Sequence, residues 1–88
     1  MLFKQINLKA LVGYTETENG KVRCLFRNLL NQRTFEKELN TSPEQITAWV
    51  MGTNIQHAMP GLTATEREYF LSGFTSQEWA KMFEEVEG

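Results

Sequence analysis

The chain has 88 residues, of which 41% are hydrophobic and 23% charged, and its formal net charge is −2. This length predicts a single domain over residues 1–88, and the composition is typical of a globular chain, not a disordered one. The slightly negative charge argues against a general binder of polyanions. The only cysteine, Cys24, excludes an internal disulfide and a cysteine-rich zinc site.

The pair Asn19-Gly20, between two alternating stretches, predicts a β-hairpin with a two-residue turn and positive φ at both turn residues. In that register Arg23 faces Glu16, which places opposite charges across the hairpin. Three residues should then point to the core, namely Val22, Cys24 and Phe26. The opposite face should be partly solvated, and it carries Val12, Tyr14, Glu16, Arg23, Leu25 and Arg27.

A second turn near Leu30–Arg33 leads into a third strand over residues 34–39. With Leu30 opposite Arg33, Arg27 faces Glu36 and the charges match again. This strand adds two residues to the core face, Phe35 and Leu39. The pattern leaves open whether residues 1–8 start a long first strand or pack as an arm.

The second half of the chain contains four helix-start signals, each a capping box of Ser or Thr followed by Glu or Gln three residues later. They are Ser42-Pro43-Glu44-Gln45, Thr53-Asn54-Ile55-Gln56, Thr63-Ala64-Thr65-Glu66 and Thr75-Ser76-Gln77-Glu78. Gly52 predicts a break or kink between the first two helices, and Gly73 predicts a left-handed end to the third.

Helices this short are stable only when they pack on something. We therefore expect most of the large apolar residues of this half to be packing residues, namely Trp49, Ile55, Leu62, Phe70, Leu71, Phe74, Trp79 and Phe83. Phe74 and Trp79 should form a hydrophobic staple at the start of the last helix. That helix also carries an apolar stripe at helical spacing, made of Trp79, Met82, Phe83 and Val86.

The expected fold is α+β. A three-stranded antiparallel meander over residues 1–40 is followed, over residues 42–86, by three or four short helices that pack on one face of the sheet. No signal peptide or apolar run long enough to cross a membrane is present, so we expect a cytoplasmic protein without membrane contact.

Residue types that carry catalysis are sparse. His57 is the only histidine, and Cys24 is expected to be a buried, inert thiol on the core face of a strand. No glycine-rich phosphate loop and no metal-ligand spacing is present. We therefore expect no enzyme activity, no cofactor and no metal site.

The segment from Ile55 to Phe83 resembles a segment of small uncharacterised proteins encoded by tailed bacteriophages and prophages. The shared residues are Ile55, Gln56, Ala58, Pro60, Leu62, Arg67, Glu68, Phe70, Leu71, Ser72 and Gly73. In similar proteins a Cys-Trp pair often follows the Ser-Gly, whereas this chain has Glu78-Trp79. The resemblance implies an origin in a phage or mobile element, with the host cytoplasm as location, and no particular activity.

Three hypotheses for function follow. The first is a non-enzymatic interaction module that binds a host or phage protein or self-associates, through Gln56, His57, Arg67, Glu68 and Tyr69. In the simpler interpretation Arg67 and Glu68 only tie the helices together. The second hypothesis is a nucleic-acid-binding domain that uses Tyr14, Arg23, Arg27 and Arg33 on the solvated sheet face. The neighbouring Glu16, Glu18 and Glu36 weaken this second hypothesis, because they neutralise much of the positive charge. The third hypothesis is an acidic mimic of nucleic acid, and it rests only on the Glu-rich C-terminal helix.

Overall fold

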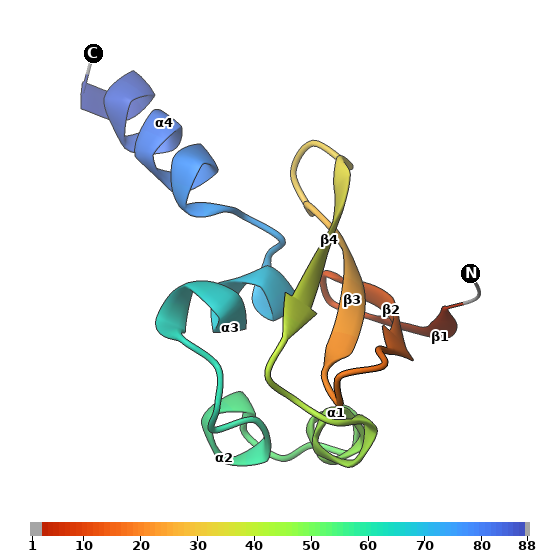
Figure 1. Cartoon of the computed structure of the whole chain (residues 1–88). Helices are drawn as coiled ribbons and strands as arrows, with labels where there is room; N and C mark the ends of the chain where they lie inside the picture. Colours follow the sequence, from red (N-terminus) through yellow and green to blue (C-terminus); the bar gives the residue numbers. More distant parts are fainter. Residues whose placement is uncertain (1–2, 88) are drawn as a thin grey trace.

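The computed structural model describes the backbone of residues 3–87 and the side chains of residues 3–81. A four-stranded antiparallel sheet in the order β1-β2-β3-β4 is followed by four helices. The strands are β1 (Lys4–Leu8), β2 (Leu11–Glu16), β3 (Val22–Arg27) and β4 (Thr34–Leu39), and the helices are α1 (Pro43–Val50), α2 (Ile55–Ala58), α3 (Ala64–Leu71) and α4 (Ser76–Glu87). Figure 1 shows α1 and α2 at one end of the sheet, α3 beside it and α4 leading away from the body. The α+β class is confirmed, although the sheet has one strand more than predicted and α4 does not lie over it.

The additional strand is β1, so the open question about residues 1–8 is answered for Lys4–Leu8, which form a separate strand, while residues 1–2 lie outside the described residues. It pairs with β2 through Lys4 opposite Tyr14 and Gln5 opposite Gly13. A Cβ added to Gly13 would lie 2.5 Å from the carbonyl oxygen of Lys4. Gly13 is therefore needed for the close approach of β1, and on its other side it lies opposite Leu25 of β3.

The hairpin between β2 and β3 forms, but its predicted register is wrong by one residue. The Thr17 amide donates to the Lys21 carbonyl at 2.9 Å, which closes a three-residue loop that ends in Gly20 at φ +81°. A three-residue loop needs left-handed backbone only at its last residue, whereas the predicted two-residue turn needs it at both. The one-residue shift turns Tyr14 to the core face, where it is 6% exposed and lies opposite Cys24.

The register between β3 and β4 differs from the prediction by two residues. Asn28 and Arg33 close the loop, since the Asn28 amide donates to the Arg33 carbonyl at 2.8 Å. An even shift leaves each side chain on its predicted face, so Val22, Cys24, Phe26 and Leu39 are buried as expected and Phe35 packs against them. The expected pair of Arg27 and Glu36 is wrong, because Arg27 lies opposite Thr34.

The helix boundaries largely follow the predicted caps. Ser42 accepts a hydrogen bond from the Gln45 amide at the start of α1, and the predicted break at Gly52 is confirmed. The cap of α2 is Asn54, not Thr53, because its side chain accepts from the Gln56 amide at 2.9 Å. Thr63 forms both halves of the predicted capping box.

The core lies between one face of the sheet and the helices α1 and α3. Phe70 of α3 sits edge-on to Phe26 at a ring-centroid distance of 4.9 Å and to Trp49 at 5.4 Å. Of the predicted packing residues, Trp49, Leu62, Phe70 and Phe74 are buried, and Ile55, Leu71 and Trp79 are half-buried. Phe83 lies outside the residues whose side chains are described. Within residues 3–87, none of the helices combines the length and hydropathy that crossing a membrane requires.

Candidate functional site

An open groove of about 560 Å³ lies between the β1–β2 turn and the loop that joins α1 to α2. We call it the α1–α2 groove. Its ten lining residues are Leu8, Lys9, Trp49, Val50, Gly52, Thr53, Asn54, Ile55, Gln56 and Leu71. They come from β1, from the β1–β2 turn and from three helices and a loop, so the groove exists only in the folded chain.

Backbone hydrogen bonds fix both walls of the α1–α2 groove. On one side, the amides of Gly52 and Thr53 donate to carbonyls of the last turn of α1, each at 3.0 Å. On the other side, the buried Ala10 donates to the Phe70 carbonyl at 3.1 Å and accepts from the Arg27 amide at 2.8 Å. The β1–β2 turn is thereby attached to α3 and to β3. These hydrogen bonds hold the backbone on both sides of the groove.

Half of the residues that line the α1–α2 groove are large and apolar, and one of the ten is charged. Its five large apolar residues are Leu8, Trp49, Val50, Ile55 and Leu71, and Lys9 is the only charged residue among the ten that line it. Val50 is 39% exposed. Met51, which stands in the sequence between the lining residues Val50 and Gly52, is 81% exposed. Neither is needed to hold α1, because Ile46 and Trp49 are the residues of that helix that reach the core.

The predicted interaction residues fall on two helices. Gln56 lines the α1–α2 groove, and His57 beside it is exposed on α2. Arg67, Glu68 and Tyr69 are half-buried on α3. The Tyr69 ring packs edge-on to Phe35 at 5.4 Å, and the Glu68 carboxylate accepts from the Ser72 hydroxyl at 2.7 Å. Tyr69 and Glu68 thus contribute to internal packing, and of the five only Gln56 lies in the groove.

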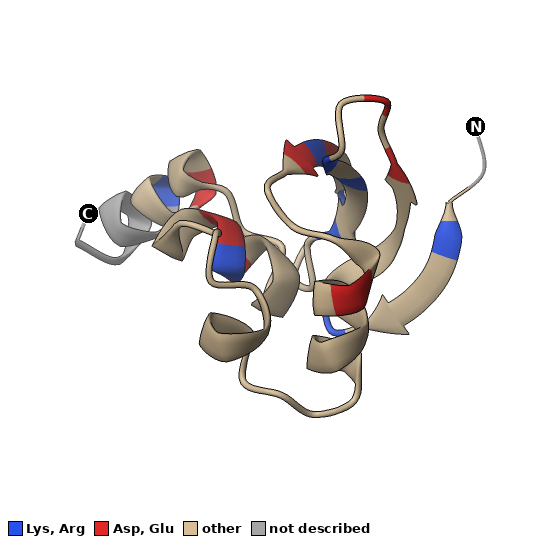
Figure 2. Cartoon of the chain, turned by 60° about the horizontal axis from the view of Figure 1, so that its bottom comes forward, with Lys and Arg blue, Asp and Glu red and all other residues tan. Residues whose placement is uncertain are grey.

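The residues of the nucleic-acid hypothesis do not share one face. Tyr14 points to the core, which corrects its predicted exposure, while Arg23 lies on the opposite side of the sheet and pairs with Glu38 at 3.6 Å. Arg33 belongs to the β3–β4 loop and pairs with Glu78, and Arg27 is exposed at the end of β3. Figure 2 shows basic and acidic positions interspersed over the sheet and the helices.

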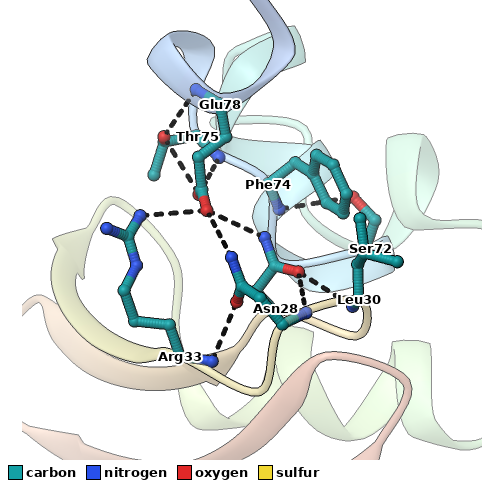
Figure 3. Close-up of polar contacts among 8 residues, drawn as sticks. Asn28, Leu30, Arg33, Ser72, Phe74, Thr75 and Glu78 are labelled. Atoms are coloured by element: carbon teal, nitrogen blue, oxygen red, sulfur yellow. Dashed lines mark hydrogen bonds and ion pairs between the residues drawn. The ribbon is translucent and has the colours of Figure 1, made fainter. Parts of the chain in front are cut away.

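A second polar cluster joins α4 to the β3–β4 loop, and we call it the α4 clasp (Figure 3). One carboxylate oxygen of Glu78 accepts from the side-chain amides of Asn28 at 3.1 Å and Asn31 at 3.2 Å, and it pairs with Arg33 at 3.0 Å. The other oxygen accepts from the amide and the hydroxyl of Thr75, both at 3.1 Å. Glu78 therefore caps α4, as its capping box predicted, and also fixes the first turn of that helix to the sheet.

The surroundings of Glu78 shift its acidity. Burial raises the pKa of the Glu78 carboxyl, but the hydrogen bonds from Thr75 and Asn31 and the charge of Arg33 outweigh it and leave the pKa below its ordinary value. Beside the α4 clasp lies a pocket of about 410 Å³, whose rim includes Leu30 at 71% exposure.

The one thiol of the chain lies in the core. Cys24 is buried, and desolvation raises the pKa of its thiol to about 12, so the reactive thiolate is strongly disfavoured at neutral pH. Among the side chains of residues 3–81, no three His, Cys, Asp or Glu residues gather closely enough to hold a metal ion.

The chain was compared with protein-family models, curated proteins and solved structures, and none of the three comparisons gives a match. The groove and the α4 clasp were both missed by sequence reasoning. One local signal pointed to the groove: Val50 and Met51 extend the apolar run of α1 beyond what its buried stripe uses, directly before Gly52. No local signal joins Asn28 to Glu78, which are 50 positions apart.

Proposed function

We propose that the chain is a non-enzymatic protein-interaction module of phage or mobile-element origin, and that it binds a protein segment in the α1–α2 groove. One observation carries the proposal. Half of the ten residues that line the groove are large and apolar, and one of them, Val50, is 39% exposed. Met51, which follows Val50 in the sequence, is still more exposed. Contiguous apolar surface of this kind on a small domain is typical of binding sites.

The chemistry of the groove favours a peptide segment as ligand over a nucleic acid. Lys9 is its only charged residue, so it offers little to a phosphate backbone, which is usually bound by several cations. The apolar lining residues suit one or two large side chains of a partner, and Gln56, Thr53 and Asn54 add hydrogen-bonding groups to the lining. The origin in a phage or mobile element is supported by the resemblance of residues 55–83.

The test is affinity capture from bacterial lysate with three immobilised forms of the chain. They are the natural chain, Met51→Asp, which lies in the sequence between the groove-lining Val50 and Gly52, and Leu30→Asp as matched control. Leu30 is a similarly exposed apolar residue in the β3–β4 loop, away from the groove. The control therefore adds the same charge to a different surface.

The proposal expects a protein that is retained by the natural chain and by Leu30→Asp but lost with Met51→Asp. Loss of about 1–2 kcal/mol at one anchor lowers affinity roughly tenfold. If the captured protein persists with Met51→Asp and disappears with Leu30→Asp, the groove is not the site. Retention of nucleic acid that weakens steeply with salt and needs Arg27 would favour the second hypothesis instead.

A further inference from the structure

The residues that line the α1–α2 groove indicate which kind of protein segment can bind in it. Five of its ten lining residues are large and apolar, Lys9 is charged, and none of the ten is acidic. A complementary segment therefore carries apolar side chains on one face together with negative charge. An amphipathic acidic helix meets both conditions.

The chain itself contains such a helix. The sequence of α4 places apolar residues at 79, 82, 83 and 86, a spacing that puts them on one side of a helix. The same twelve residues include four glutamates and one lysine, namely Glu78, Glu84, Glu85, Glu87 and Lys81. The last six residues of this helix, residues 82–87, extend about 9 Å along its axis.

Within one copy, α4 and the α1–α2 groove are kept apart. The α4 clasp fixes the first turn of α4 to the β3–β4 loop, and Figure 1 shows that loop and the pair α1–α2 at opposite ends of the sheet. The connection from α3 is also fixed, because Gly73 packs directly on the backbone of Arg27 and Asn28. An α4 that fills the groove must therefore come from a second copy.

We infer that the chain forms a symmetric dimer in which the acidic, apolar C-terminal part of α4 of each copy, residues 82–87, occupies the α1–α2 groove of the other. The contact is reciprocal, so two copies satisfy both grooves and the assembly closes. Trp79 stacks on Phe74 of its own copy at a ring-centroid distance of 5.2 Å, so the inserted part begins beyond it. This inference rests on the proposed function, since it assigns a second copy as the partner of the groove.

The test is the mass of the full chain in solution, measured by light scattering over a concentration series. The natural chain is expected to dimerise. Met51→Asp adds a charge between the groove-lining Val50 and Gly52, and Phe83→Asp adds one to the apolar positions of α4. Each should weaken dimerisation roughly tenfold or more. Val86→Asp serves as a second helix variant, and circular dichroism checks that every variant is folded.

Mixing the two damaged forms gives the sharper result. Met51→Asp keeps an intact α4 and Phe83→Asp keeps an intact groove, so an equimolar mixture can rebuild one of the two contacts and should contain more dimer than either form alone. If Phe83→Asp is monomeric but Met51→Asp dimerises normally, α4 pairs with α4 and the inference is wrong.

Failure of the inference can be separated from failure of the proposed function. A natural chain that is monomeric at all concentrations overturns the dimer. If that monomer still captures another protein in a Met51-dependent way, the proposed function stands. A dimer without any other captured protein supports the inference and makes self-association the function of the groove.

Discussion

The helices α3 and α4 are joined to the sheet in two different ways. α3 is held by rings in the core, where Phe70 contacts Phe26 and Trp49, and by two backbone hydrogen bonds at its C-terminal end. α4 is held at its first turn by one carboxylate, that of Glu78, and by the separate ring pair of Phe74 and Trp79. Apolar burial in the first case supports the whole fold, whereas the polar attachment in the second fixes only where one helix points.

The difference also separates what each helix does in our proposals. α3 forms part of the wall of the α1–α2 groove through Leu71, so it belongs to the receptor side of the contact. α4 is the inserted side. Three substitutions test whether the two attachments are as different as the structure indicates, and their expected effects fall in order of size.

Phe70→Ala should have the largest effect. Removing a fully buried ring from the centre of the core costs about 3–5 kcal/mol, which is a large share of the roughly 5–15 kcal/mol that stabilises a domain. Urea unfolding should show this loss, and the thiol of Cys24 should become accessible to a disulfide reagent. Phe74→Ala is the control, since Phe74 packs with Trp79 outside the main core cluster. An equal loss for both variants would contradict the separation of the two regions.

Gly73→Ala should have the next largest effect. Gly73 has φ +77°, and an added Cβ would lie 2.5 Å from the Arg27 carbonyl oxygen. The left-handed penalty and the overpacking together predict a loss of roughly 2–4 kcal/mol in urea unfolding.

Gly20→Ala isolates the steric part of that effect, because Gly20 has nearly the same φ of +81° but nothing within 4 Å of its added Cβ. Its loss should stay near 1–2 kcal/mol, the conformational term alone. Equal losses for the two variants would mean that the backbone around Gly73 shifts to accommodate the added Cβ. The direction of α4 would then be set by Glu78 alone.

Glu78→Gln should have the smallest effect on global stability, about 1 kcal/mol, the difference between charged and neutral hydrogen bonds. The change should appear in the amide resonances of α4 and the β3–β4 loop, with the strands unaffected. The pKa of Glu78 is lowered in the folded chain, so the contribution of the α4 clasp is complete above the ordinary glutamate value of about 4.3. It is lost as the pH falls through the lowered folded value. In the Gln variant that acid transition should be absent, and its persistence would show that another group holds α4.

Local signals in the sequence predicted the helices well and the strand registers less well. Capping boxes such as that of Thr63 involve residues three apart and predict a helix start without knowledge of the fold. The β3–β4 register was wrong by two, which left Phe35 on its correct face, whereas the one-residue error at Asn19-Gly20 moved Tyr14 from the surface to the core. The same one-residue error placed Tyr14 on the solvated face, where the nucleic-acid hypothesis used it as its aromatic residue.

The candidate site was harder to predict than the fold because it depends on contacts between distant parts of the chain. Gln56 was named from the sequence, but Leu8, Lys9 and Leu71 meet it only after β1 and α3 have packed. The α4 clasp likewise joins residues that have no shared periodicity. Pattern reasoning reports which residues face the core, and it does not report which exposed residues become neighbours.

The two edges of the sheet have a consequence for how copies can meet. Within β1 the ladder is irregular between Gln5 and Leu8, and Asn7 has φ +56°. β4, at the other edge, presents three consecutive exposed charges, those of Glu36, Lys37 and Glu38. Kinked backbone and charged side chains are the usual means by which proteins prevent another strand from extending a sheet. Both edges of the sheet therefore disfavour open-ended, fibre-like growth by addition of strands. The proposed contact between α4 and the α1–α2 groove does not use these edges, so dimerisation through it leaves this protection in place.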